Sequence, residues 1–353
     1  MLKKSLFYLL ITLLTMILLA GCNGEEKTAD TGKEKENAVE EKEQVETDAD
    51  EASNVYPLTG VKTNKPVNDR IVGVMVNNHT KARPQTGLSK ADIVFEILAE
   101  GQITRFLAMF QSQQPEIVGP VRSAREYYFE LANGYEALYV YHGAAGFVND
   151  MIKNRGIEHL NGSIYDNDGN LFKRETFRQA PHNSYLLFDA VYEVAKEKSY
   201  DVKHDYKPLP FLDKKEVGNI SGKPANHVEI VYSDNPMEVV EFKYDEENGN
   251  YTRFNDREKT VELNSETPIQ VENVFIVFTD HKVIDSAGRR AIDIKSGGDA
   301  YLIQNGKIQE VQWENREGRI IPVKDGQPVG FVPGQTWINI VPNEDKKSVN
   351  ILN

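Results

Sequence analysis

The chain has 353 residues, which is long enough for two ordinary domains, and it carries a formal net charge of −13 with a single cysteine. One cysteine excludes structural disulfide bonds within the chain and excludes zinc or iron–sulfur sites that are bound by several cysteines. The negative charge argues against nucleic acid as a partner, because a phosphate backbone repels an acidic protein.

The first 21 residues have the three parts of a secretory signal peptide. Lys3 and Lys4 form a basic segment, residues 6–19 are apolar, and the sequence Leu-Ala-Gly-Cys ends at Cys22. This site resembles a bacterial lipobox, in which the cysteine is acylated and the chain is cut just before it. We therefore predict that acylated Cys22 anchors the protein to the outer face of the cytoplasmic membrane. A plain signal peptide with a chance cysteine and an uncleaved anchor are the alternatives.

Residues 22–54 form an acidic segment. Residues 23–54 hold four basic and twelve acidic side chains, a net charge of −8 (4 − 12), and almost no large apolar side chain. Such a segment cannot bury enough apolar surface to offset the entropy lost on ordering. We predict that it is a disordered tether.

The pattern of residues 55–200 predicts an α/β domain. Short apolar runs predict buried strands at 71–76, 93–99, 103–111 and 137–141. Helical spacing and capping residues predict helices at 123–134, 147–154 and 185–198. In the first of these helices, Ser123 and Glu126 fit a capping box.

The pattern changes after residue 200. Residues 201–224 contain three prolines and little periodicity, so we interpret them as a linker. From 225 to 353, short alternating segments predict strands without helices, and Asn-Gly pairs at 248–249 and 305–306 predict tight hairpins. We expect a β-rich domain there, either a sandwich or a barrel, and a fold of the α+β or α/β class for the whole chain.

Two glutamates interrupt an otherwise apolar strand face. Glu96 and Glu100 are four residues apart, about 13 Å at their Cα atoms in an extended strand. Acid–base hydrolysis of a glycoside needs two carboxyl groups about 5 to 9.5 Å apart, which leaning side chains could just reach. The structural alternative is that Glu96 pairs with Arg105 across the hairpin, because an unpaired buried charge is costly. Ligand binding is the third alternative.

The segment from Gly119 to Arg125 predicts an anion site. It leads into the start of a predicted helix, where unpaired N–H groups and the helix dipole attract negative charge. Arg122 and Arg125 stand on either side of Ser123 and suit a carboxylate or a phosphate. The alternative is an internal salt bridge to one of the two glutamates. Both can hold at once, because an arginine has five donors.

Two histidines are candidates for proton transfer. His142 ends a predicted strand and His182 precedes a predicted helix; satisfied structural histidines are the alternative. Neither has a second ligand at i+2 or i+4, so we expect no metal, and we expect no cofactor. Residues 166–170 begin like a calcium loop but lack its glycine at position 6 and its glutamate at position 12, so a turn explains them better.

Several motifs together resemble one family, the YerB-like lipoproteins of Gram-positive bacteria. The resemblance is carried by Pro57-Leu58-Thr59-Gly60, Asn78-His79, Ala82-Arg83-Pro84-Gln85-Thr86-Gly87, Ala91-Asp92-Ile93-Val94-Phe95-Glu96, Glu100-Gly101, Thr104-Arg105-Phe106, Gly119-Pro120-Val121-Arg122-Ser123-Ala124-Arg125, His142-Gly143, Ala180-Pro181-His182-Asn183, Asn273-Val274 and Pro333-Gly334-Gln335-Thr336-Trp337-Ile338. It spans about residue 55 to the end. The family is described as a domain of unknown function in N- and C-terminal parts, so the resemblance implies a fold partition and a location and no activity.

We expect a non-catalytic, lipid-anchored protein of the cell envelope that binds an anionic wall glycopeptide or an acidic segment of a partner protein. The candidate ligand-binding residues are Arg83, Gln85, Thr104, Arg105, Arg122, Ser123, Arg125, Arg178 and Asn183. The first alternative is a metal-independent hydrolase or lyase of wall glycan that uses Glu96 or Glu100 with His142 or His182. The second alternative is a scaffold that recruits cell-wall enzymes through its β-rich half.

Overall fold

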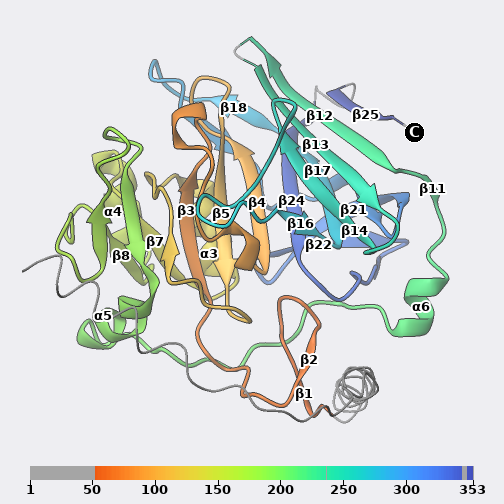
Figure 1. Ribbon diagram of the computed structural model, residues 1–353, viewed down its shortest axis with the longest axis horizontal. Helices are drawn as coiled ribbons and strands as arrows, with labels where there is room; N and C mark the ends of the chain where they lie inside the picture. The colour runs from red at the N-terminus through yellow and green to blue at the C-terminus, as the bar shows by residue number, and fades with distance from the viewer. Residues whose placement is uncertain (1–51, 236, 344–347, 353) are drawn as a thin grey trace, which may run out of the picture. The chain divides into compact units, whose positions relative to one another are not determined.

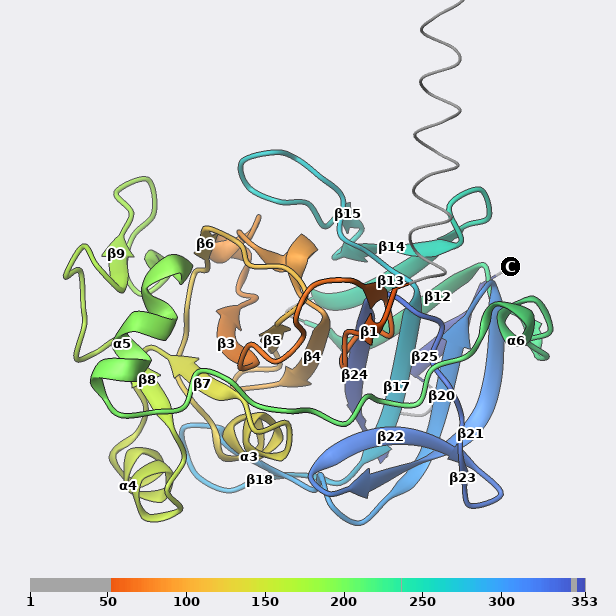
Figure 2. The ribbon, with the colours of Figure 1, turned by 90° about the horizontal axis from the view of Figure 1, so that it is seen from below.

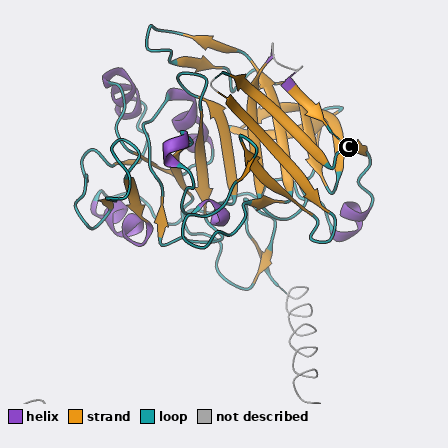
Figure 3. Ribbon diagram, turned by 45° about the horizontal axis from the view of Figure 1, so that its top comes forward, coloured by secondary structure: helices purple, strands orange, loops and turns teal. Residues whose placement is uncertain are grey.

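One mixed β-sheet of twelve strands contains strands from both halves of the chain (Figures 1 and 3). The first half contributes β3 (Val72–Asn77), β4 (Ile93–Leu98), β5 (Thr104–Phe110), β7 (Leu138–Tyr141) and β8 (His159–Asn161). The second half contributes β11 (Lys223–Pro224), β17 (Asn273–Thr279), β20 (Gly298–Gln304), β21 (Lys307–Arg316), β22 (Arg319–Lys324), β23 (Gln327–Pro328) and β24 (Thr336–Pro342). We call this the large sheet.

The computed structural model describes residues 52–235, 237–343 and 348–352. The predicted signal peptide, Cys22 and the predicted tether up to Glu51 lie outside the described residues. In the described ranges no helix is both long enough and apolar enough to cross a membrane.

The two halves meet at β24. This strand lies between β17 and β4 and runs parallel to both. In its register Asn339 stands opposite Ile276 on one side and opposite Glu96 on the other. On the far side of β4, β5 and then β3 follow as antiparallel neighbours. A strand from the end of the chain is therefore built into the middle of the sheet.

A second sheet of six strands packs on one face of the large sheet. Its strands are β12 (His227–Asp234), β13 (Met237–Asp245), β14 (Asn250–Asn255), β15 (Glu258–Lys259), β16 (Gln270–Val271) and β25 (Val349–Ile351). Side chains such as Val228 and Phe242 from this sheet share one core with Val76, Phe106 and Trp337 from the large sheet. The six-stranded sheet and the large sheet therefore enclose a shared core, and the large sheet includes strands of both halves.

The opposite face of the large sheet is covered by α3 (Glu126–Gly134) and the residues around it. Figure 2 shows β12–β14 on one side of β4, β24 and β17, and α3 on the other. A second core there joins Met75, Phe95 and Leu107 to Tyr128 and Leu131. Successive residues of a strand point to opposite faces, so each of the central strands contributes to both cores.

The remaining elements are short. They are β1 (Asn54–Val55), β2 (Lys62–Thr63), η1 (Thr80–Ala82), η2 (Leu88–Lys90), β6 (Ile117–Val118), α4 (Gly146–Asn154), β9 (Phe172–Arg174), β10 (Ser184–Leu187), η3 (Phe188–Ala190), α5 (Val191–Glu197), α6 (Lys214–Gly218), β18 (His281–Val283) and β19 (Arg290–Ile292). The chain is strand-rich and two-domain with few helices, and the N-terminal α/β domain that we expected is not clearly present. The predicted linker contains α6 and β11.

Two predicted helix starts are wrong. Residues 184–187 form β10, which pairs with β6 on one side and β9 on the other, so the helix of this region is limited to α5. The helix predicted from Ser123 begins at Glu126 with Arg125 as its N-cap and without a side-chain cap. The preceding segment is held instead by backbone hydrogen bonds from Arg122 to Met75 and from Ala124 to Gly143.

The contact between α3 and the β21–β22 turn gives a test of the fold. A Cβ atom at Gly134 would overlap the backbone carbonyl of Gly318. Alanine is preferred to glycine in a helix by up to about 1 kcal/mol. We expect Gly134→Ala to destabilise the protein nevertheless, by about 1–3 kcal/mol, because neither backbone can move cheaply.

The measurement is the free energy of unfolding in urea, with Gly146→Ala as the matched control. A Cβ atom at Gly146 meets nothing within 4 Å, so this change should be neutral or stabilising. A Gly134→Ala variant as stable as the control would contradict the packing described here.

Candidate functional site

The candidate site residues fall into two groups on opposite faces of β3–β5. Thr104 and Glu96 share the face of Phe106, which points to the second sheet. Arg105 shares the face of Leu107, which points to α3. The alternation of side chains along a strand separates the two groups, although they are adjacent in sequence.

The first group forms a polar network buried between the two sheets. Its centre is the ion pair of Glu96 on β4 with Arg253 on β14, in which both side chains are 0% exposed. Arg253 Nη2 donates to both carboxylate oxygens of Glu96 at 2.9 and 3.0 Å. Thr104 Oγ1 and Trp337 Nε1 donate to the same carboxylate at 2.8 and 2.7 Å. Glu96 is therefore fully occupied by protein donors.

The aromatic side chains complete this environment. The guanidinium carbon of Arg253 lies 4.6 Å from the ring centroid of Trp337 and 5.2 Å from that of Phe106. A planar cation over an aromatic face is stabilised by the negative face of the ring. We call the set Asn78, Glu96, Thr104, Glu238, Arg253 and Asn255 the inter-sheet network.

Glu238 is a second buried carboxyl group in this network. Its Oε1 accepts a hydrogen bond from Asn78 at 2.9 Å and lies 3.0 Å from Thr104 Oγ1. Arg83 Nη2 lies 3.2 Å from the same oxygen. Burial raises the pKa of Glu238 to about 7, with Arg83 opposing that effect and the negative charge of Glu96 adding to it. This carboxyl group therefore titrates near neutral pH.

Arg83 and Gln85 also serve the inter-sheet network. Arg83 pairs with Asp256 and donates from Nε to the backbone oxygen of Asn78 at 2.9 Å. Gln85 Nε2 donates to Asn78 Oδ1 at 3.0 Å. A cavity of about 500 Å³ lies beside this group and includes Arg83, Gln85 and Asp256 in its lining.

The second group is an arginine cluster, which we define as Arg105, Arg122 and Arg125 with Glu100. Arg105 Nη2 lies 3.2 Å from Glu100 Oε2, and Arg125 pairs with Glu100 Oε1. Arg105 Nη1 also donates to the backbone oxygen of Ser123 at 2.8 Å. Burial acts to raise the pKa of Glu100, but the two arginines outweigh it and hold the pKa below its ordinary value.

Arg122 differs from its two neighbours. Among the described residues its side chain has no hydrogen-bond or ion-pair partner, and its Nε is buried. Burial, followed by repulsion from Arg105 and Arg125, lowers the pKa of Arg122 to about 10. The guanidinium is still charged at neutral pH. A partly buried cation that has no ion-pair partner can gain charge-assisted hydrogen bonds by binding an anion.

Two histidines with adjacent, tilted rings lie within the electrostatic reach of Arg122. The rings of His79 and His182 are 4.6 Å apart at their centroids. Asn77 Nδ2 lies 2.9 Å from His182 Nδ1, so in the neutral ring the proton is on Nε2. Burial, followed by the charges of His79 and Arg122, lowers the pKa of His182 to about 4. At neutral pH both rings are uncharged, because burial also lowers the pKa of His79.

His142 and Asn183 belong to a separate group around Arg174. Arg174 Nη1 donates to Asn183 Oδ1 at 2.9 Å, and its Nη2 lies 3.4 Å from His142 Nε2. His142 Nδ1 lies 2.7 Å from Ser184 Oγ. Burial, followed by the charge of Arg174, lowers the pKa of His142.

The chain matches both parts of one family. The N-terminal domain of DUF3048, a protein of unknown function, matches residues 58–201, and the C-terminal domain of DUF3048 matches residues 228–338. The chain belongs to the DUF3048 family. The unmatched residues 202–227 between the two parts nearly coincide with the predicted linker.

The named relatives agree with this assignment. "Putative lipoprotein YerB" of Bacillus subtilis (strain 168) is 47% identical over 299 residues, which are 83% of this chain and 88% of the relative. The crystal structure of YerB protein from Bacillus subtilis matches with a TM-score of 0.79 at 45% identity, over 85% of this chain and 100% of the solved chain. The family resemblance inferred from the motifs is confirmed.

The predicted pairing of Glu96 with Arg105 is wrong. Arg105 faces α3 and binds Glu100, whereas the partner of Glu96 is Arg253. The register explains the error, because Glu96 stands opposite Phe106 and so points to the face opposite that of Arg105. Arg178 is likewise separate from the arginine cluster and donates to Tyr185 and to the backbone of Pro84, both at 2.6 Å.

Several residues of the inter-sheet network were not predicted. Glu238, Arg253 and Asn255 lie on strands that were expected only to form a β-rich domain. A signal exists for Arg253, since it shares the inward face of β14 with Tyr251 and therefore needs a buried counter-ion. Within the described ranges no group of three or more His, Cys, Asp or Glu side chains could hold a metal ion. Asp168 Oδ1 accepts three backbone N–H groups of its own turn.

The raised pKa of Glu238 predicts an unusual pH dependence. In the unfolded chain this carboxyl group has its ordinary pKa of 4.5, and in the folded chain it holds its proton up to about pH 7. Folding therefore binds a proton between these values, and the stability contributed by this group falls as the pH rises from 4.5 to about 7. Measured against Glu238→Gln, the free energy of unfolding of the wild type should fall by as much as ~3 kcal/mol across that window.

The measurement is urea unfolding at several pH values. Glu310→Gln is the control, because Glu310 is an exposed carboxylate, and the difference between wild type and this variant should be nearly constant with pH. A constant difference between wild type and Glu238→Gln would contradict the raised pKa.

Proposed function

We propose that this chain is a lipid-anchored, non-catalytic protein of the cell envelope that binds a carboxylate-bearing ligand at Arg122. The supporting observation is the guanidinium of Arg122, which lacks a partner in the described part of the chain and has a buried Nε. Every other arginine of the predicted set has a carboxylate or a carbonyl to bind. A ligand anion would supply the contact that Arg122 lacks.

The surroundings of Arg122 favour a negatively charged ligand. Arg105 and Arg125 share the carboxylate of Glu100, and Arg122 adds a third guanidinium group, which leaves the cluster with an excess of positive charge. The nearby His182 keeps its Nε2 proton and can donate a hydrogen bond. The planar fork of an arginine matches both oxygens of a carboxylate, so we favour a wall glycopeptide or an acidic partner segment.

The location rests on Cys22 and on the relative. Cys22 ends a lipobox-like sequence, and the related YerB is described as a lipoprotein. An acylated Cys22 would hold the binding unit on the outer face of the cytoplasmic membrane. The twelve acidic residues of the segment 23–54 would keep that unit away from an anionic surface by repulsion.

The geometry does not favour the hydrolase alternative. Glu96 is 0% exposed and is bound by Arg253, and Glu100 is shared by two arginines. The two carboxyl groups belong to different groups on opposite faces of the sheet. Deletion of the β-rich half would not isolate the scaffold alternative, because removal of the chain after residue 220 would take β24 out of the large sheet.

Arg122→Gln should weaken binding of soluble peptidoglycan fragments with free carboxylates by about 10- to 100-fold, the loss of one charge-assisted contact. The measurement is isothermal titration with residues 52–353, which form one compact unit. Arg316→Gln is the matched control, since Arg316 is paired with Glu314 at the surface of β21. Amidation of the fragment carboxylates should reduce binding to wild type as much as Arg122→Gln does.

The stability of the variant separates a binding role from a structural role. Removal of an unpaired, partly buried cation should leave the free energy of unfolding unchanged or raise it. Unchanged fragment affinity together with lower stability in Arg122→Gln would overturn the proposal.

A further inference from the structure

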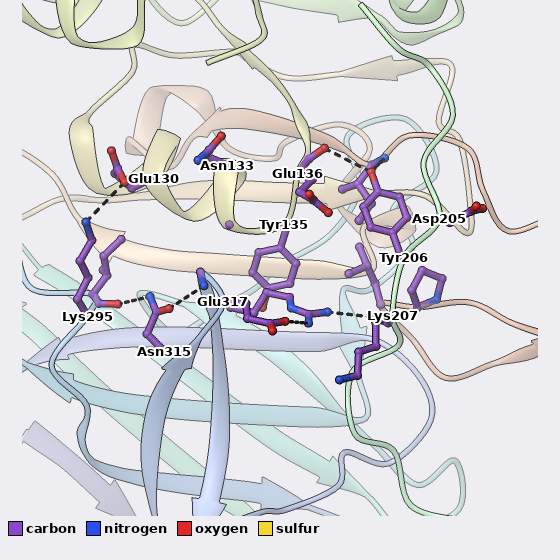
Figure 4. A pocket seen from close by; sticks show the side chains of 17 residues that line it. Glu130, Asn133, Tyr135, Glu136, Asp205, Tyr206, Lys207, Lys295, Asn315 and Glu317 are labelled. Carbon is purple, nitrogen blue, oxygen red and sulfur yellow. Dashed lines mark hydrogen bonds and ion pairs between the residues drawn. The ribbon is translucent and has the colours of Figure 1, made fainter. Parts of the chain in front are cut away.

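A cavity of about 800 Å³ lies between the end of α3, residues 205–207 and the β21–β22 hairpin. None of its lining residues belongs to the arginine cluster or to the inter-sheet network. Figure 4 shows two facing walls, one formed by α3 with the residues that follow it and one formed by the strands below. The volume is in the range of cavities that hold small molecules and short peptides.

The lining carries charges of both signs, and several already have partners: Lys295 contacts Glu130, His204 contacts Glu136, and Arg319 contacts Glu317 on the hairpin wall. Glu130 and Glu136 lie on the α3 wall, and Lys295 and Lys207 lie toward the opposite side (Figure 4). The carboxyl end of α3 adds the negative end of its dipole to the first wall. Arg319 belongs to the second side, where its Nη1 donates to the backbone oxygen of Lys207 at 2.8 Å.

A buried hydroxyl without a partner lies between the walls. Tyr135 is 2% exposed, and among the described residues nothing bonds to its hydroxyl. Figure 4 shows its ring between the two walls. Burial raises the pKa of Tyr135 while the charge of Arg319 opposes that rise, which places the phenol near the basic side and keeps it protonated. Such a group can donate one hydrogen bond and accept another.

A backbone contact fixes the spacing of the two walls, and apolar residues also line the cavity. Gly134 at the end of α3 and Gly318 in the hairpin turn touch through their backbones, so the walls meet at that point. Pro57, Leu58 and Ile71 also line the cavity. The side chains of Asp205 and Lys207, one of each sign, have no partner in the described part of the chain. The lining therefore combines apolar side chains with charges of both signs.

We propose that this cavity binds a short zwitterionic peptide. The ammonium group of the peptide lies at the α3 wall, near Glu136 and Asp205. Its carboxylate lies near Arg319 and Lys207, and the hydroxyl of Tyr135 bonds to a peptide group between them. The proposal is independent of ligand binding at Arg122.

The probe is tetra-alanine in three forms: free, acetylated at its amino end and amidated at its carboxyl end. Binding to residues 52–353 is followed by isothermal titration and by chemical-shift changes in NMR spectra. Free tetra-alanine should bind, and each blocked form should bind about 10-fold more weakly, because each lacks one charge-assisted contact.

Tyr135→Phe provides the decisive variant. It removes the hydroxyl and keeps the ring, so the affinity for free tetra-alanine should fall about 5- to 20-fold. Its unfolding temperature should stay the same or rise, since the lost hydroxyl has no partner to leave behind. A structural role for the hydroxyl would instead lower the unfolding temperature.

Arg319→Gln should weaken the free and acetylated forms but not the amidated form. Arg289→Gln is the control and should bind all three forms as the wild type does, because Arg289 pairs with Asp285 and does not line the cavity. Lack of binding of free tetra-alanine at millimolar concentration would overturn the proposal. So would equal affinity in Tyr135→Phe, or binding that is lost in Arg122→Gln, which would assign the peptide carboxylate to the arginine cluster.

Discussion

A buried ion pair connects the two sheets of this protein. Its members are the carboxylate of Glu96 and the guanidinium of Arg253. Glu96 and Arg253 are each 0% exposed, and burial of either charge alone would cost several kcal/mol. The pair persists because its hydrogen-bonding capacity is met, with Thr104 and Trp337 donating to the carboxylate. Glu96 comes from β4, Trp337 from β24 and Arg253 from β14. The interaction therefore connects both halves of the large sheet to the second sheet.

The position of Arg105 in the arginine cluster follows from the direction of Thr104, which bonds to Glu96. Thr104 points toward Glu96, and the alternation of the strand then directs Arg105 to the opposite face, where it meets Glu100 beside Arg125 and Arg122. The two sets of charges differ in one respect. Glu96 and Arg253 in the inter-sheet network form an ion pair within the chain, whereas Arg122 has no ion-pair or hydrogen-bond partner among the described residues. A charge that is paired within the chain serves the fold, whereas an unpaired charge can attract a ligand of opposite sign.

Local signals predicted much of the fold. The apolar runs predicted β3, β4, β5 and β7, and the Asn-Gly pairs predicted the hairpins β13–β14 and β20–β21. The Gly119–Arg125 segment contributes Arg122 and Arg125 to the arginine cluster, and the anion site predicted there stays a prediction. Long-range partners were not predictable, because Arg253 is 157 residues from Glu96 in the chain. A one-residue difference in hairpin register reversed the expected partner of Arg105, and the apolar residues of β10 fitted a helix as well as a strand.

The central claim is that Glu96 is the structural partner of Arg253, and a double-mutant cycle on the free energy of unfolding tests it most directly. The cycle compares wild type, Glu96→Leu, Arg253→Met and the double variant by urea unfolding. Each single change should cost about 3–5 kcal/mol, because it leaves a buried charge without its partner. The double variant should be far more stable than the sum of the two losses predicts. Additive losses, or a Glu96→Leu variant as stable as the wild type, would contradict the account.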